Sequence, residues 1–151
     1  MKKLSLVLLV SLLLSGCTVP FIGKGKAGLK ILTSVPATVI LDGKQEGTTP
    51  FEKADLKPKT YRLQLIPQSG QPWETTLTLH DDLLAVVERT TGDNDQESEG
   101  YIMELEKISD KNQSQLAVVT IPDPAAVRVD GQPKGFAPLT TTLSTDGNHE
   151  V

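Results

Sequence analysis

Short apolar stretches that alternate with polar residues follow one another along most of the chain. In residues 61–65 (YRLQL) and 73–79 (WETTLTL), apolar side chains recur at every second position, as in a strand with one buried face. Further β-rich stretches are residues 29–33, 37–41, 83–91, 101–105, 116–121 and 125–129. Turn signals separate them at intervals of about eight to twelve residues, and no helical stripe appears. The pattern predicts an all-β fold, namely an antiparallel β-sandwich.

One stretch of the chain occurs twice. Residues 36–50 (PATVILDGKQEGTTP) and 124–138 (PAAVRVDGQPKGFAP) align without a gap. The identical pairs, each 88 positions apart, include Pro36 and Pro124, Asp42 and Asp130, Gly43 and Gly131, Gly47 and Gly135, and Pro50 and Pro138. A fixed offset between several such residues indicates that one supersecondary unit is used twice.

The repeated residues are typical of turns. Asp-Gly between two β-rich stretches predicts a hairpin, because glycine accepts a positive φ. The Gly-x-x-Pro that follows predicts a second turn, and its proline ends a strand because it lacks an N–H. We interpret Asp42 and Asp130 as structural residues whose side chains bond their own backbone in the turn.

The second copy is shorter than the first. Residues 143–151 (LSTDGNHEV) parallel residues 56–63 with one extra residue, with a turn at Asp146-Gly147 and a strand that starts at His149. The expected organisation is a first β-domain at residues 29–108, a linker at 109–115 and an incomplete second repeat at 116–151. An incomplete sheet exposes unpaired edges, so we expect the chain to be part of a longer protein.

The spacing of these motifs resembles that of PEGA domains, short β-rich modules of bacterial and archaeal surface proteins. The resemblance covers most of residues 29–151, although neither copy contains Pro-Glu-Gly-Ala and the first has Lys59-Thr60 where the family has a late glycine. It implies a non-catalytic module with no shared ligand site, and therefore no enzymatic activity and no cofactor.

The first residues have the pattern of a targeting signal. Lys2 and Lys3 precede an apolar run at residues 4–14, which is too short to cross a bilayer of about 30 Å. Leu14, Ser15, Gly16 and Cys17 then resemble the bacterial lipobox, in which cleavage before the cysteine is followed by its lipidation. We therefore expect a signal peptide at residues 1–16, a lipidated Cys17, a tether at residues 17–28, and a location on the extracytoplasmic face of the cell membrane.

The net charge and the cysteine content limit the classes of partner that we expect. Removal of residues 1–16 takes away two lysines and changes the formal charge from −4 to −6. An acidic protein is a poor match for nucleic acid. Cys17 is the sole cysteine, so no disulfide is possible within the chain. The partners that we expect are the membrane, through Cys17, and cell-wall or surface glycans or proteins.

Two motifs suggest ligand sites but fit a structural explanation better. The glycines at Gly23, Gly25 and Gly28 match a dinucleotide fingerprint, yet no strand precedes them and no helix follows, so we interpret them as spacer. The acidic segment at residues 93–104 has acids at the first, third, fifth and twelfth positions of a calcium loop, but Ser98 stands where that loop needs glycine. A solvated hairpin tip is the favoured interpretation, and weak calcium binding is the alternative.

Candidate catalytic and sugar-binding residues are few. His80 is followed by two aspartates, which supply too few ligands for a metal and fit a turn between strands. A Ser–His–Asp constellation is possible through His80 or His149 alone. Tyr61 and Trp73 could form an aromatic sugar-binding face, but in a domain with so few aromatics we expect positions in the core or covering it.

The sequence thus predicts a non-enzymatic, lipid-anchored envelope protein that presents tandem β-modules as a structural, spacer or adhesive element. The alternative is an accessory subunit that binds glycans or proteins and whose main functional part lies beyond residue 151. No metal site is expected.

Overall fold

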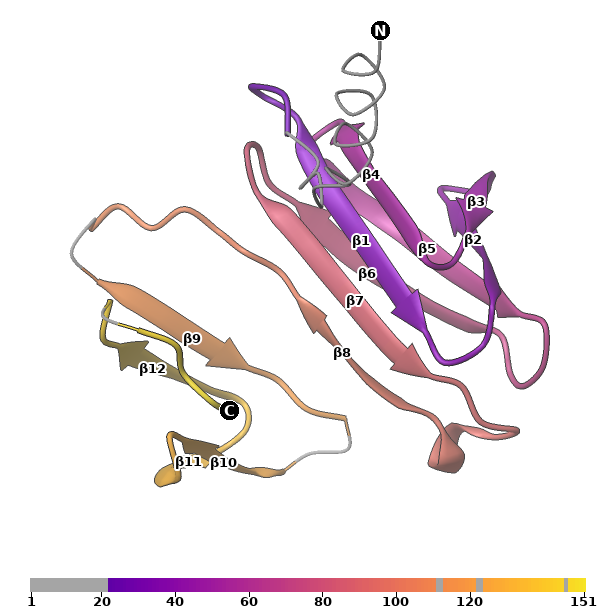
Figure 1. Cartoon of the computed structure of the whole chain (residues 1–151). Coiled ribbons are helices and arrows are strands. Elements are labelled where there is room, and N and C mark those ends of the chain that lie inside the picture. The colour runs from indigo at the N-terminus through magenta and orange to yellow at the C-terminus, as the bar shows by residue number, and fades with distance from the viewer. Residues whose placement is uncertain (1–21, 111–112, 122–123, 146) are drawn as a thin grey trace, which may run out of the picture. The chain divides into compact units, whose positions relative to one another are not determined.

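The computed structural model describes residues 22–110, 113–121, 124–145 and 147–151 (Figure 1). The chain divides into two compact units, Met1–Glu106 and Lys107–Val151, and each is described by itself. The predicted all-β fold is confirmed: the described residues form strands, one short 3-10 helix and no α-helix.

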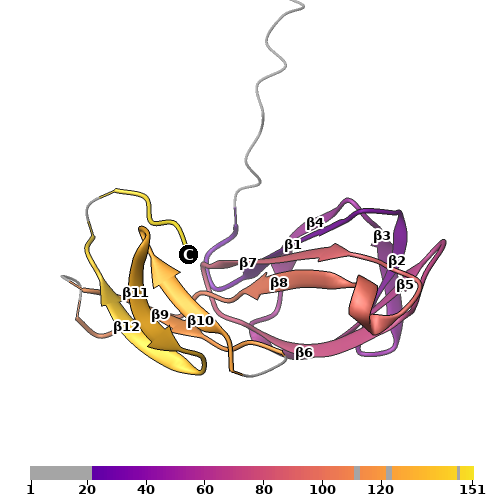
Figure 2. The same ribbon diagram turned by 90° about the horizontal axis from the view of Figure 1, so that it is seen from below.

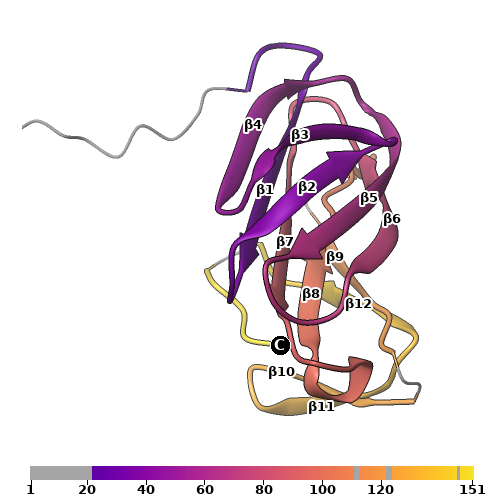
Figure 3. The same cartoon turned by 90° about the vertical axis from the view of Figure 1, so that its right-hand side faces the viewer.

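Unit 1 consists of two four-stranded sheets. The first, which we call sheet 1, has the order β4-β1-β7-β8, and sheet 2 has the order β3-β2-β5-β6. The strands are β1 (Ala27–Thr33), β2 (Ala37–Leu41), β3 (Lys44–Thr48), β4 (Phe51–Leu56), β5 (Lys59–Pro67), β6 (Trp73–Leu79), β7 (Leu84–Thr90) and β8 (Glu99–Met103), with the 3-10 helix η1 (Asp95–Glu97) before β8. The two layers are visible in Figure 2, and sheet 2 faces the viewer in Figure 3.

The core lies between the two sheets. Alternate residues point inward because successive side chains of a strand lie on opposite faces. In β5, for example, Tyr61, Leu63 and Leu65 are buried and Arg62 is exposed. The core cluster comprises Ala27, Leu29, Ile31, Ala37, Val39, Leu41, Phe51, Leu56, Tyr61, Leu63, Leu65, Leu77, Leu79, Ala85 and Val87. Both sheets contribute to this single cluster, so unit 1 is a sandwich.

One strand pair departs from the antiparallel prediction. The pairing of β1 with β7 is parallel, in register from Gly28↔Leu84 to Thr33↔Arg89. The other pairs of unit 1 are antiparallel. These two strands lie far apart in the chain and no hairpin joins them, so no local turn signal fixes their relative direction.

Two strands of unit 1 were not predicted from the sequence. They are β3 and β4, which have no regular alternation of apolar and polar residues. Each forms because a turn brings the chain back beside an existing strand, with which it pairs: β3 pairs with β2, and β4 pairs with β1. Cross-strand hydrogen bonding therefore specifies these strands more than burial does.

Polar contacts connect the two sheets near their outer strands. Lys53 of β4 lies 2.7 Å from the Glu46 carboxylate of β3. Beyond β8, Glu104 accepts a hydrogen bond of 2.7 Å from the backbone N–H of Thr78 in β6. A free N–H at a sheet edge is a site for unwanted strand pairing, and the Glu104 carboxylate occupies this one.

Unit 2 repeats the first four strands of unit 1. They are β9 (Ser114–Val118), β10 (Ala126–Val129), β11 (Gln132–Phe136) and β12 (Leu139–Leu143), coloured orange to yellow in Figure 1. Antiparallel pairs form between β10 and β11 and between β12 and β9. These match the β2–β3 and β4–β1 pairs of unit 1.

The structure corrects two predicted strands in unit 2. The strand predicted at residues 116–121 is β9, which lies at Ser114–Val118, and Val119 and Ile121 are exposed. Residues 149–151, predicted to begin a strand, are not part of one. The Asp130 N–H nevertheless donates to the Glu150 carbonyl oxygen, as the Asp42 N–H donates to Arg62 of β5 in unit 1. Residues 149–151 therefore occupy the position of β5, although no described strand pairs with them.

We predict that shortening the side chain of Leu63 destabilises unit 1, because Leu63 is fully buried in its core. Leu63→Ala should lower the free energy of unfolding by about 2–5 kcal/mol, because it removes buried methyl groups and leaves a cavity. Ile66 is on the same strand but is 46% exposed, so Ile66→Ala should lower the free energy of unfolding far less. Chemical denaturation of the two variants measures this, and equal losses would contradict the assigned core.

Candidate functional site

The repeated Asp-Gly turn of unit 1 joins the β2–β3 hairpin to β5. Asp42 and Gly43 have φ values of 50° and 79°, as a two-residue turn with both central residues left-handed requires. The Asp42 N–H donates to the Arg62 carbonyl oxygen at 2.9 Å. The Arg62 N–H donates back to Asp42 Oδ1 at 3.0 Å, and Lys59 Nζ lies 2.5 Å from Oδ2. Both carboxylate oxygens are therefore engaged.

The same arrangement recurs in unit 2. Asp130 and Gly131 have φ values of 53° and 73°. The Asp130 N–H donates to the Glu150 carbonyl oxygen at 2.9 Å, and the Glu150 N–H donates to Asp130 Oδ1 at 3.0 Å. His149 Nδ1 lies 2.7 Å from Oδ2, where unit 1 has the ammonium group of Lys59. The repeat in sequence is thus a repeat in hydrogen bonding.

This geometry corrects the interpretation of the two aspartates. We expected each side chain to bond the backbone of its own turn, but each accepts from an amide twenty positions further along the chain. The hydrogen bond from Lys59 is the main cause of a lowered pKa of Asp42, and the hydrogen bond from His149 is the main cause of a lowered pKa of Asp130. Each carboxylate therefore remains charged and links a turn to the next segment.

The Gly-x-x-Pro positions form the second shared turn. In unit 1 the Thr49 N–H donates to the Ala37 carbonyl oxygen at 2.9 Å, and the Thr49–Pro50 peptide bond is cis. In unit 2 Ala137 donates to the carbonyl oxygen of Ala125 at 2.8 Å, and the bond to Pro138 is also cis.

The glycine of this turn lies beside a large side chain in both units. A Cβ at Gly47 would lie 3.2 Å from the ring of Phe51, and one at Gly135 would lie 3.7 Å from Leu139. A register shift also falls at matching positions, between Val39 and Ile40 and between Val127 and Arg128. The predicted turn residues thus have equivalent structural surroundings in the two copies.

Glu46 is the centre of a small charge cluster on β3. Its two carboxylate oxygens lie 2.7 Å from Lys44 Nζ and 2.7 Å from Lys53 Nζ. The hydrogen bond from Lys44, followed by that from Lys53, lowers the pKa of Glu46 to about 2. Lys134 stands at the equivalent position of unit 2, so this cluster is not repeated.

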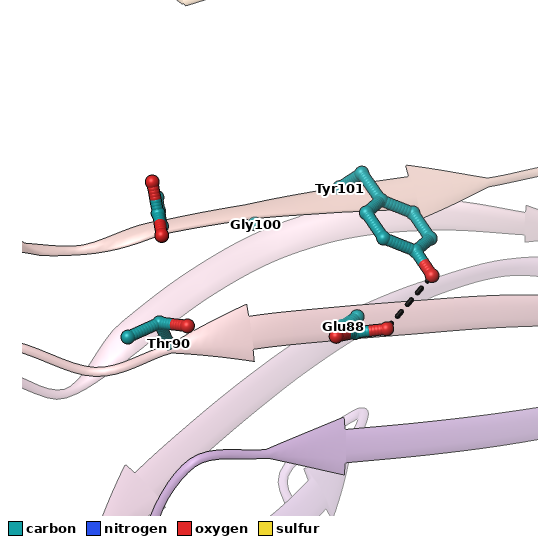
Figure 4. A pocket seen from close by; sticks show the side chains of 5 residues that line it. Glu88, Thr90, Gly100 and Tyr101 are labelled. Atoms are coloured by element: carbon teal, nitrogen blue, oxygen red, sulfur yellow. Dashed lines mark hydrogen bonds between the residues drawn. The ribbon is translucent and has the colours of Figure 1, made fainter. Parts of the chain in front are cut away.

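A shallow depression of about 370 Å³ lies on β7 and β8, lined by Glu88, Thr90, Glu99, Gly100 and Tyr101. Figure 4 shows Tyr101 above Glu88, and the tyrosine hydroxyl donates to Glu88 Oε2 at 2.8 Å. This bond raises the pKa of Tyr101. The sequence did not indicate this group, because strand pairing places Glu88 opposite Tyr101 and local patterns do not show it.

The acidic segment is a hairpin tip between β7 and β8, as the favoured interpretation predicted. Asn94 Oδ1 accepts from the backbone N–H groups of Gln96 and Glu97 at 3.0 Å each, which orders the turn. Glu104, the twelfth position of the supposed calcium loop, accepts a hydrogen bond from Thr78 instead. Among the described residues, no group of three acidic, histidine or cysteine side chains could hold a metal ion.

The two aromatic candidates belong to the core. Tyr61 is buried and donates from its hydroxyl to the Lys57 carbonyl oxygen at 3.0 Å. Trp73 packs against the core cluster, and the Arg89 guanidinium lies 4.5 Å from its ring centroid, in a cation–π contact between the sheets. Tyr61 thus lies in the core and Trp73 covers its margin, which confirms the expected positions.

The remaining motifs fall in turns or outside the described residues. His80 lies between β6 and β7, as predicted for a turn. Gly23 and Gly25 precede β1, which begins at Ala27 and contains Gly28, so no helix follows the supposed fingerprint. Leu14, Ser15, Gly16 and Cys17 lie outside the described residues. No helix in the described part of the chain is long and apolar enough to cross a membrane.

We predict that the Glu46 cluster makes unit 1 sensitive to acid. Because the pKa of Glu46 is lowered from 4.5 to about 2, its stabilising contribution is present above pH 4.5 and is lost as the pH falls toward 2. Glu46→Gln should lower Tm at neutral pH, and its difference from wild type should shrink over that range. Glu106→Gln, at an exposed position outside the strands, is the control and should leave Tm unchanged. A Glu46→Gln difference that is constant with pH would refute the assignment.

Comparison with known proteins finds a family match for part of unit 1. Neither a curated protein nor a solved structure matches the chain. Residues 28–87, which extend from β1 into β7 and contain the first Asp-Gly turn, match the family model of the PEGA domain.

Proposed function

We propose that this protein is a non-enzymatic, lipid-anchored component of the cell envelope that presents two PEGA-like modules as a structural, spacer or adhesive element. The observation that carries the proposal is the repeated turn. In two separate units, Asp42 and Asp130 make the same two hydrogen bonds to the backbone of the following segment, one through the aspartate N–H and one through its carboxylate. The PEGA match at residues 28–87 supports an extracellular or surface-associated module.

The recurring residues are engaged in holding the fold, which favours a display role over catalysis. In unit 1, both oxygens of Asp42 are bonded, to the Arg62 amide and to Lys59. In unit 2, both oxygens of Asp130 are likewise engaged, by the Glu150 amide and by His149. The feature that both units share is therefore a turn that stabilises the fold, as expected of a spacer.

The start of the chain supports attachment to a membrane. Cys17 follows Leu14, Ser15 and Gly16 in the lipobox pattern, and β1 begins at Ala27. A lipid on Cys17 would hold the first module close to the bilayer, since about nine residues separate the anchor from the first strand. Stable anchoring needs two or more acyl chains, each contributing about 0.8 kcal/mol per buried methylene.

A glycan- or protein-binding accessory role is the second candidate. It is favoured by the depression beside Tyr101, where a half-exposed aromatic ring lies near the carboxylates of Glu88 and Glu99. Aromatic faces with a few polar groups are common in ligand sites. Binding of the full chain to purified cell-wall glycan that is lost in Tyr101→Ala, and retained in Thr75→Ala on the other sheet, would favour this candidate over the spacer.

The anchor is tested by the intact mass and detergent partitioning of wild type and Cys17→Ser, expressed in a bacterium. We expect wild type to have the mass of residues 17–151 plus acyl chains and to enter the detergent phase. Cys17→Ser should lack the acyl mass and stay in the aqueous phase.

A wild-type protein without acyl mass, cleaved at another position and unaffected by Cys17→Ser, would refute the anchored part of the proposal. Cys17 is the sole cysteine, so the substitution changes no other thiol.

A further inference from the structure

The imidazole of His149 is held between two parts of unit 2. Its Nδ1 lies 2.7 Å from Asp130 Oδ2, in the turn between β10 and β11. Its Nε2 lies 3.1 Å from the Ser144 carbonyl oxygen and 3.2 Å from Ser144 Oγ, after β12. The side chain is 19% exposed, so most of the ring is shielded from solvent.

Both ring nitrogens thus face oxygen atoms that accept hydrogen bonds. A carboxylate and a carbonyl can only accept, and a neutral imidazole has a proton on just one nitrogen. Only the imidazolium form donates to Asp130 and to the Ser144 carbonyl at the same time. The hydrogen bond to Asp130 is the main cause of a raised pKa of His149, and the bond to the Ser144 backbone adds to it.

Unit 1 uses a different cation in the same place. Lys59 pairs with Asp42 there, and the pKa of Lys59 is raised further by that bond, so it stays charged through the physiological range. His149 changes its charge near neutral pH. Among the residues that the structure describes, the other charged groups near it are Lys134 on β11, which opposes its protonation, and the adjacent Glu150.

We propose that His149 is a pH-dependent latch: its protonated ring holds residues 149–151 against the β10–β11 turn, and loss of the proton loosens them. Without the proton, the charge pair with Asp130 disappears. A nitrogen lone pair then faces either the Asp130 carboxylate or the Ser144 carbonyl. The Ser144 hydroxyl can donate to Nε2 in that state, so the segment loosens gradually rather than leaving at once.

The direction of the pH effect follows from the linkage between protonation and stability. A group whose pKa is raised in the folded state stabilises fully below its unfolded value, here 6.5, and this contribution is lost as the pH rises through the folded value. The latch therefore holds in mildly acidic surroundings and loosens toward alkaline pH. Unit 1, with Lys59, has no such transition near neutrality.

The same three residues have the connectivity of a hydrolase triad, with Ser144 on one ring nitrogen and Asp130 on the other. Two observations favour the latch. Nε2 also faces the carbonyl oxygen of Ser144 itself, which favours a protonated ring that cannot act as a base. The aspartate equivalent to Asp130 pairs with a lysine in unit 1, where no histidine contacts it.

NMR titration of the full chain in detergent micelles from pH 5 to 9 tests the latch. The His149 ring and the Glu150 amide should titrate together with a midpoint above 6.5, while the Arg62 amide of unit 1 should not move. Asp130→Asn should bring the His149 midpoint down toward 6.5. His80→Asn, which removes the other histidine, should leave the Glu150 transition unchanged.

A matched substitution separates charge from shape. In His149→Lys the Glu150 amide should remain protected from hydrogen exchange across the whole range, because the cation is permanent. A wild-type Glu150 amide that does not respond to pH, or a His149 midpoint at or below 6.5, would overturn the latch. Hydrolysis of p-nitrophenyl acetate that is lost in Ser144→Ala would overturn it in favour of a catalytic triad.

Discussion

The fold depends first on the burial of one face of each sheet against the other. Leu29, Ile31 and Val87 of sheet 1 and Val39, Leu63 and Leu77 of sheet 2 are at most 1% exposed and belong to one cluster. No disulfide can supplement this core, because the chain has a single cysteine. The position of every turn and of every polar contact between the sheets therefore depends on strands that are held in place mainly by hydrophobic burial.

Within that frame, the Asp-Gly turn connects a hairpin to the segment that follows. The aspartate reverses the chain and uses its carboxylate to fix Arg62 in unit 1 and Glu150 in unit 2. What differs between the units is the cation on the second carboxylate oxygen. Lysine makes the link insensitive to physiological pH, whereas histidine makes it responsive, so two copies of one geometry have different chemical behaviour.

Strands that are rich in β-forming residues or alternate clearly could be predicted from the sequence, and strands defined by their partners could not. Residues 37–41, a β-rich run, and residues 73–79, which alternate, were predicted with the bounds that β2 and β6 have. The polar β3 exists through its pairing with β2, and the parallel β1–β7 pair joins distant segments. Neither kind of pairing leaves a local pattern.

The same limit applies to the candidate site. The Asp-Gly and Gly-x-x-Pro turns could be found because their residues recur at a fixed offset. The partner of Asp42 could not, because Arg62 is twenty positions away and is brought near by the pairing of β2 with β5. The Glu88–Tyr101 contact and the three oxygen atoms around His149 likewise arise from segments that meet only after folding.

The central claim is that both aspartates hold the following segment through the same hydrogen bond, from a backbone amide to the aspartate carboxylate. A long-range NMR experiment that detects scalar coupling across N–H···O=C bonds measures this directly. The account predicts coupling from the Arg62 amide to the Asp42 carboxylate and from the Glu150 amide to the Asp130 carboxylate in one sample at mildly acidic pH. Coupling at Arg62 with none at Glu150 under those conditions would show that the two units do not share this geometry, and would contradict the account.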